Sequence, residues 1–210
     1  MQIRFQLLIL VALTLLCYLP FVKAPFIWDD QQFVTDNVTV QTMNVGQMFR
    51  ESTTAGANIP SNYFRPLTSL SFAIDAGWWG KNPLGFHLTN LVLHISAGLL
   101  LFWLLTQIGV SKRWRFWITA FFLLHPVQTE AVQYISSRGD SLSAVLSMLG
   151  LNLFWLGLTR QRIAIKFQDL NQSIPRWLLL VASALFYILA VLAKELAHPA
   201  SNEPELLSKF

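Results

Sequence analysis

Two adjacent carboxylates, Asp29 and Asp30, follow directly after a long apolar stretch of the chain. Adjacent side chains point in different directions in any regular backbone, so at most one of these acids faces a given site. The apolar side chains at 26–28 would hold such an acid at a membrane boundary, partly out of water. Partial desolvation makes a carboxylate a stronger base, one able to take a proton from a hydroxyl group. The alternative is a pair of ordinary acids in a solvated loop.

Glu130 is a further candidate acid, and Arg138 follows eight residues later. If the apolar stretch that starts at 116 continues as a helix, Glu130 lies near the edge of the bilayer, where an acid is costly and usually functional. Arg138 would lie on roughly the same helical face, and the alternative is an ion pair that only holds the segment. Asp140 precedes an apolar run in a pattern typical of a helix N-cap.

His87, Asn90 and His94 share one face of an expected helix. The two histidines are about 10.5 Å apart along the axis, at a rise of about 1.5 Å per residue, which is too far for one ion. We therefore expect a polar stripe that faces the bundle interior rather than a metal site. The sequence also has no glycine-rich phosphate loop, no zinc-ligand spacing and no Ser or Cys beside a His. We expect no metal and no cofactor, with a divalent cation as the alternative.

Membrane helices have to position these residues. Hydrophobic residues make up 54% of the 210 residues and charged residues only 12%, about half the charged share of a soluble domain. This composition excludes disorder, a coiled coil and a disulfide scaffold, and predicts an all-α polytopic helix bundle. The third expected span contains His125 and Pro126, so it either continues through them or stops early and re-enters. About five spans are expected from the apolar lengths, at 5–22, 84–110, 114–135, 141–158 and 177–193.

The basic residues predict the orientation of the bundle. Eight bases and one acid lie at Arg4, at 112–115 and at 160–176, and Lys/Arg-rich ends stay in the cytoplasm. The long structured loop 23–83, Glu130 and Lys194 then share the outer face. The net charge of +4 is accounted for by these topology signals, so we expect membrane lipids and no nucleic acid as partners. The absence of eukaryotic signals leans toward a bacterial inner membrane over an ER membrane.

Four pieces of the sequence, in this order, resemble the transmembrane and tetratricopeptide repeat-containing family, which is similar to the protein O-mannosyltransferases of the GT-C fold. The pieces are FIWDDQQFVTDN, NYFRPLTSLSFAIDAGWWGKNPLGFHLTNLVLH, HPVQTEAVQYISSRGDSLSAVL and LAKE. The resemblance implies transfer of a sugar, mannose-like, from a polyprenyl- or dolichyl-phosphate donor to a protein or glycan hydroxyl. It also implies that an acid at the position of Asp29 and Asp30 acts as the base.

A lipid-phosphate sugar already carries a good leaving group, so such a site needs one base and one or two cations beside the departing phosphate. Arg65, Arg138 and Lys194 are the cations of the outer face near the membrane. The two arginines rank first because arginine binds phosphate in a bidentate way. Among the acids, Asp30 ranks before Asp29, and Glu130 is the third candidate.

The resemblance covers residues 1–195 as the N-terminal part of a longer family pattern, and the polar tail 196–210 departs from it. Family members continue with further spans and a soluble array of repeats. We therefore expect a truncated product without transferase activity of its own, because later spans would complete the carrier pocket. Two functions of other classes stay open, a small polytopic transporter lined by the polar stripe, or a non-catalytic membrane scaffold.

Overall fold

The computed structural model describes residues 2–159, 174–194 and 196–197. Over these residues the protein is a bundle of α-helices, and the predicted all-α fold class is confirmed. Four helical segments in the described part are long and apolar enough to cross a membrane, at Ile3–Phe21, Pro83–Gln107, Ile135–Thr159 and Arg176–Ala193. The protein is therefore a multi-pass membrane protein. The basic loop at 160–173 and the tail from 198 lie outside the described residues.

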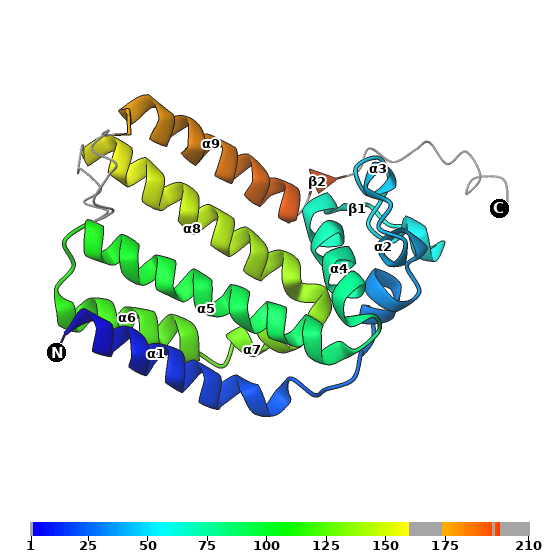
Figure 1. Cartoon of the computed structure of the whole chain (residues 1–210), viewed down its shortest axis with the longest axis horizontal. Coiled ribbons are helices and arrows are strands. Elements are labelled where there is room, and N and C mark those ends of the chain that lie inside the picture. Colours follow the sequence, from blue (N-terminus) through cyan, green and yellow to red (C-terminus); the bar gives the residue numbers. More distant parts are fainter. Residues whose placement is uncertain (1, 160–173, 195, 198–210) are drawn as a thin grey trace, which may run out of the picture.

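The long helices lie side by side in Figure 1, and their neighbours in space are α5 with α8 and α8 with α9. The apolar side chains along these helices suit a lipid environment. Adjacent helices pack with small and polar side chains between them. Their bounds are α1 (Ile3–Tyr18), α5 (Pro83–Gln107), α8 (Arg138–Thr159) and α9 (Arg176–Ala193).

Residues 23–82 form a cap over one end of the long helices (Figure 1). A core of apolar side chains holds the cap together and includes Phe33, Val40, Phe72 and Phe86. Because Phe86 belongs to α5 and Phe72 to the cap, this core also fastens the cap to the bundle. The elements are a 3-10 turn η1 (Leu19–Phe21) that leads into the cap, a π-helical turn η2 (Gln31–Thr35), α2 (Val38–Gln41), α3 (Val45–Met48), η3 (Ala55–Ala57), β1 (Tyr63–Phe64) and α4 (Pro66–Trp79).

In the structure, the expected span 114–135 consists of two shorter helices. The helix does not continue through His125 and Pro126 but stops before them. α6 (Lys112–Leu124) ends before His125 and Pro126, and α7 (Gln128–Gln133) begins after them. Proline has no N–H and clashes with the preceding turn, which ends α6 there. With 13 and 6 residues, neither helix reaches the about 20 residues that a span needs.

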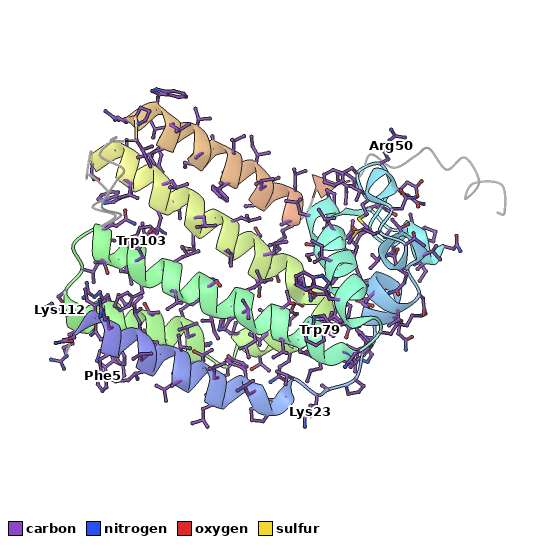
Figure 2. All side chains as sticks on the ribbon, in the orientation of Figure 1. Phe5, Lys23, Arg50, Trp79, Trp103 and Lys112 are labelled. Carbon is purple, nitrogen blue, oxygen red and sulfur yellow. The ribbon has the colours of Figure 1, made fainter. Side chains whose placement is uncertain are left out.

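The two short helices nevertheless connect the same two ends of the bundle as one span would. α6 starts at the end away from the cap, where Gln6 Nε2 of α1 donates to Lys112 O at 2.9 Å. Figure 2 shows Phe5 and Lys112 at this end and Trp79 and Arg50 toward the other. α7 leads through the 3-10 turn η4 (Ile135–Ser137) into α8 at the cap end.

The polar stripe of α5 faces the interior, as predicted, and it satisfies the interrupted backbone. His94 Nε2 lies 3.0 Å from Leu123 O, whose usual helical donor, Val127 N, donates to the ring of His125 instead. Asn90 Nδ2 donates to Tyr134 O at 3.4 Å, just beyond α7. Unsatisfied carbonyls inside a membrane are costly, so these contacts stabilise the break. His94 and Asn90 are used in this way, while His87 Nε2 lies 3.1 Å from Ala24 O in the cap.

The orientation of α5 gives a testable expectation. The only cysteine, Cys17, is replaced by Ser, and single cysteines are introduced at the exposed positions Lys81 and Ser111, at opposite ends of α5. We expect a membrane-impermeant maleimide to label only Lys81→Cys from outside intact cells and only Ser111→Cys from the cytoplasmic side of inverted vesicles, because the bases at 112–115 stay in the cytoplasm. Labelling of both positions from one side contradicts this topology.

Candidate functional site

A cavity of about 420 Å³ lies at the cap end, between the cap, α7, η4 and the ends of α8 and α9. Acids, bases and hydroxyl groups line it together. It contains four of the six residues predicted from the sequence, and two others are elsewhere. The polar lining residues are Asp29, Gln32, Thr54, Ser61, Tyr63, Arg65, Glu130, Tyr134, Ser136, Ser137, Asp140 and Lys194.

Asp29 lies two residues before the turn η2, is exposed and lines the cavity. Its Oδ1 accepts a hydrogen bond from Gln32 Nε2 at 2.7 Å, one turn further along the chain. Its backbone carbonyl accepts from Phe33 N at 3.0 Å, which fixes the backbone of the acid. The carboxylate is therefore held in place at the cavity.

Asp30, the acid ranked first from the sequence, is not among the residues that line the cavity. Its side chain is fully buried. Oδ1 accepts from both the backbone N–H (2.9 Å) and the hydroxyl (2.5 Å) of Ser136, and Oδ2 accepts from Ile27 N at 3.0 Å. A tight turn, with Trp28 at a φ of +45° and Asp30 N donating to Ile27 O, directs Asp30 inward and Asp29 outward. Asp30 joins the cap to η4.

Arg138 is likewise buried and is not among the residues that line the cavity, although its neighbour Ser137 is. Its guanidinium forms an ion pair with Asp75 of α4, with Arg138 Nη2 2.7 Å from Asp75 Oδ2. Nε donates to Asn90 Oδ1 at 2.7 Å, and the group lies 4.5 Å from the centre of the Phe72 ring. Arg138 therefore forms a structural ion pair, which was the alternative, but its partner is Asp75 and not Glu130.

The two cations of the cavity are Arg65 and Lys194. Lys194 Nζ lies 2.6 Å from Asp140 Oδ1, and both side chains are about half exposed, at 47% and 50%. α8 begins at Arg138, so Asp140 lies inside its first turn and not before the helix. The predicted N-cap role of Asp140 is therefore wrong. Arg65 is half-buried, and its Cζ lies 4.8 Å from the centre of the Tyr63 ring.

Contacts between the cap and the end of α9 bring these two cations to one cavity. Ala193 O, at the end of α9, accepts from Thr68 Oγ1 of α4 at 2.7 Å. Beyond it, the short strand β2 (Leu196–Ala197) pairs antiparallel with β1, which directly precedes Arg65. Backbone pairing therefore fixes the position of Lys194, as well as that of Arg65, relative to the cavity.

Tyr134 is a site residue that sequence reasoning missed. It follows α7, lines the cavity and lies beside Asp29. Burial raises the pKa of Tyr134, and its hydrogen bond with the Asp29 side chain raises it further. The phenol therefore stays protonated at neutral pH and acts as a donor to Asp29. The only signal in the sequence is the break at Pro126, which makes α7 end early enough to place Tyr134 at the cavity.

The arrangement combines a positioned carboxylate with two cations. Glu130 of α7 is exposed and lines the same cavity. Across the described ranges, no three His, Cys, Asp or Glu residues are grouped so that they would hold a metal ion. The cavity therefore suits proton transfer to a carboxylate next to an anionic group that binds Arg65 and Lys194.

The chain is similar to several curated proteins named protein O-mannosyl-transferase. It is 30% identical over 157 residues to F38B6.6 of Caenorhabditis elegans, 29% over 193 residues to Tmtc1 of Drosophila melanogaster and 29% over 147 residues to TMTC1 of Homo sapiens. These matches cover 70%, 90% and 67% of this chain, and 22%, 21% and 17% of the relatives, so the chain spans about a fifth of their length. No family model and no solved structure matches the chain significantly.

Proposed function

We propose that the cavity at the cap end serves sugar transfer from a lipid-phosphate donor to a hydroxyl acceptor. The premise is that the chain belongs to the transmembrane and tetratricopeptide repeat-containing family of protein O-mannosyl-transferases. One observation carries the proposal. Asp29, Arg65 and Lys194 come from three distant parts of the chain and line one cavity at the end of the membrane helices. A base and two phosphate-binding cations are what this reaction needs.

In the proposed reaction, the Asp29 carboxylate takes the proton of the acceptor hydroxyl. The acceptor oxygen then forms a bond to the anomeric carbon of the sugar, and the bond from that carbon to the phosphate oxygen breaks. The lipid phosphate leaves with the bonding electrons, and Arg65 and Lys194 stabilise its charge. Tyr134 donates to Asp29 and orients the carboxylate. The cations act on the donor and the carboxylate acts on the acceptor.

The ion pair of Lys194 with Asp140 indicates how the phosphate would bind. Both side chains are half exposed, so this pair contributes little to stability. The donor phosphate is a diester with one negative charge, like the carboxylate, and its charge rises as the lipid phosphate leaves, so it competes with Asp140 for Lys194 most strongly during the transfer. Asp140 holds the ammonium group in the cavity until a donor binds.

We expect Lys194→Gln to weaken donor binding by roughly ten- to a hundredfold, because a hydrogen bond to a charged group contributes about 1.5–3 kcal/mol and about 1.4 kcal/mol is tenfold in affinity. The affinity for a synthetic polyprenyl-phosphate mannose is measured with the protein in nanodiscs at two salt concentrations. The matched control is Asp140→Asn, which releases Lys194 and is expected to bind the donor as tightly as the wild type or more tightly. Unchanged donor affinity in Lys194→Gln removes this lysine from the site.

The proposed function is tested in two steps with the 210-residue chain in proteoliposomes. Binding of polyprenyl-phosphate mannose is measured first, with the unsugared lipid phosphate as competitor. Transfer of mannose to a Ser/Thr peptide is measured second. Binding without transfer assigns the donor part of the site to this chain and agrees with the expectation of an inactive chain. A protein that neither binds the donor nor transfers the sugar contradicts the proposal.

A further inference from the structure

A second hollow of about 290 Å³ adjoins the cavity and shares Asp29, Gln32 and Ile59 with it. Trp28, Gln31 and Asp36 are the other polar or aromatic residues of its lining. Asp29 therefore stands at the boundary of two spaces. A base that serves a two-substrate transfer has to contact the acceptor on one side and face the donor on the other, so the second hollow is where an acceptor would lie.

Trp28 is the largest exposed side chain at this hollow, with 83% of its surface accessible. Its φ of +45° is a left-handed conformation that a bulky residue rarely adopts. The hydrogen bonds between Ile27 and Asp30 on either side hold the backbone there. The indole also contacts the Tyr134 ring edge to face, with 6.2 Å between the ring centres. The exposed aromatic face is thus fixed next to Asp29.

The two spaces differ in charge. Arg65 and Lys194 line the cavity together with the carboxylates of Asp29, Glu130 and Asp140, whereas the second hollow is lined by Asp29 and Asp36 and by no Lys or Arg. The Asp36 carboxylate is exposed and accepts from the hydroxyl of its neighbour Thr35 at 3.1 Å. The cations that bind a phosphate line the cavity only, and the second hollow, with two acids and no base, repels it. A cationic side chain has the opposite preference, and an exposed tryptophan face attracts the same cations.

We propose, resting on the function proposed above, that the second hollow is the acceptor subsite and that it selects polypeptides with a Lys or Arg beside the accepting Ser or Thr. The cationic side chain lies over the indole of Trp28, and its charge pairs with the Asp36 carboxylate. Gln31 and Gln32 supply amide groups for the peptide main chain. Trp28 and Asp36 are then specificity-determining residues, while Asp29 takes the proton.

The test compares two labelled peptides that differ only in a Lys or a Gln two residues from the Ser. Their affinities are measured by fluorescence anisotropy with the chain in nanodiscs, with and without polyprenyl-phosphate mannose. We expect the Lys peptide to bind roughly three- to tenfold more tightly, as an exposed cation–π contact and an exposed ion pair together give. The preference is expected to shrink at high salt.

Three variants make the assignment specific. Asp36→Asn and Trp28→Leu should remove the Lys preference, while Trp28→Phe, which keeps an aromatic face, should retain part of it. The midpoint of thermal unfolding and the donor affinity should be unchanged in Asp36→Asn, which separates selectivity from folding. Equal binding of the two peptides, or a preference that survives both Asp36→Asn and Trp28→Leu, overturns the inference.

Other outcomes are also decisive. If Trp28→Leu weakens both peptides equally and Asp36→Asn weakens neither, the hollow binds a neutral group and the cationic selectivity is wrong. The bound Lys peptide can be displaced by a neutral oligosaccharide or by the Gln peptide. If the oligosaccharide is the stronger competitor of the two, the acceptor is a glycan and the inference fails. A chain that binds no donor contradicts the proposed function, while the peptide comparison without donor still tests the subsite.

Discussion

Asp29→Asn is expected to lower the rate of mannose transfer by about 10²–10⁴ and to leave donor binding unchanged. The amide has the size of the carboxylate and can still interact with Gln32 and Tyr134, but it cannot accept the proton of the acceptor, and loss of a general base has about this effect. Donor affinity and the rate under saturating donor are measured separately. Where the chain alone transfers too slowly, a chimera is used in which it replaces the matched 193 residues of the Drosophila relative.

The matched control is Asp30→Asn, one residue further. Because Asp30 accepts three hydrogen bonds inside the protein, this variant is expected to lower the unfolding midpoint as well as the rate. Asp29→Asn should leave the midpoint unchanged, since its side chain is exposed. Transfer at the wild-type rate in Asp29→Asn, with Asp30→Asn inactive yet fully stable, would return the role of base to Asp30.

Arg138→Met is expected to lower the free energy of unfolding by about 3–5 kcal/mol, because it leaves the Asp75 carboxylate buried without its cation. Arg138 also fastens α8 to α5 through Asn90 and Phe86, so these contacts are lost with it. The free energy is measured by SDS titration in mixed micelles. Lys194→Gln, which breaks a half-exposed ion pair, is the comparison and should cost less than about 1 kcal/mol.

The double variant Arg138→Met/Asp75→Leu identifies the cause of that loss. Replacing both partners of a buried pair with apolar groups removes the uncompensated charge and is often close to neutral. We expect it to recover part of the stability that Arg138→Met loses. A double variant that is less stable than Arg138→Met would mean that the other contacts of Asp75, including the hydrogen bond from Thr89 at 3.0 Å, matter more than the charge pair.

The sequence predicts the helices better than it predicts which acid faces the cavity. Long apolar stretches are a local property, and they led to the four long helices α1, α5, α8 and α9, though not to the division of 114–135 into α6 and α7. The orientation of Asp29 and Asp30 depends instead on the turn at Trp28 and on hydrogen bonds with Ser136, which is 106 residues further along the chain. No local pattern records this partner, so the order of the two acids could not be obtained from spacing alone.

The same reason explains the misplaced arginine. Arg65 and Arg138 look alike from the sequence, since each lies near an expected membrane boundary. What separates them is Asp75, which contacts Arg138 across α4 and α8. Asp75 belongs to the segment AIDAGWW, which reads as amphipathic surface from its composition. Lys194 and Arg65, by contrast, come together through the pairing of β1 with β2, two strands of two residues each that carry almost no sequence signal.

The break between α6 and α7 has a consequence for how the protein is made. A ribosome-bound translocon recognises a continuous apolar segment of about 20 residues, and α6, with 13 residues and three bases at its start, does not present one. This segment has to enter the membrane by packing on α1 and α5, which leave the ribosome earlier and provide Gln6 and His94 as its partners. We infer that α6 and α7 take their place only after α1 and α5 are in the membrane. The wall of the cavity that holds Glu130 and Tyr134 is completed by assembly rather than by insertion.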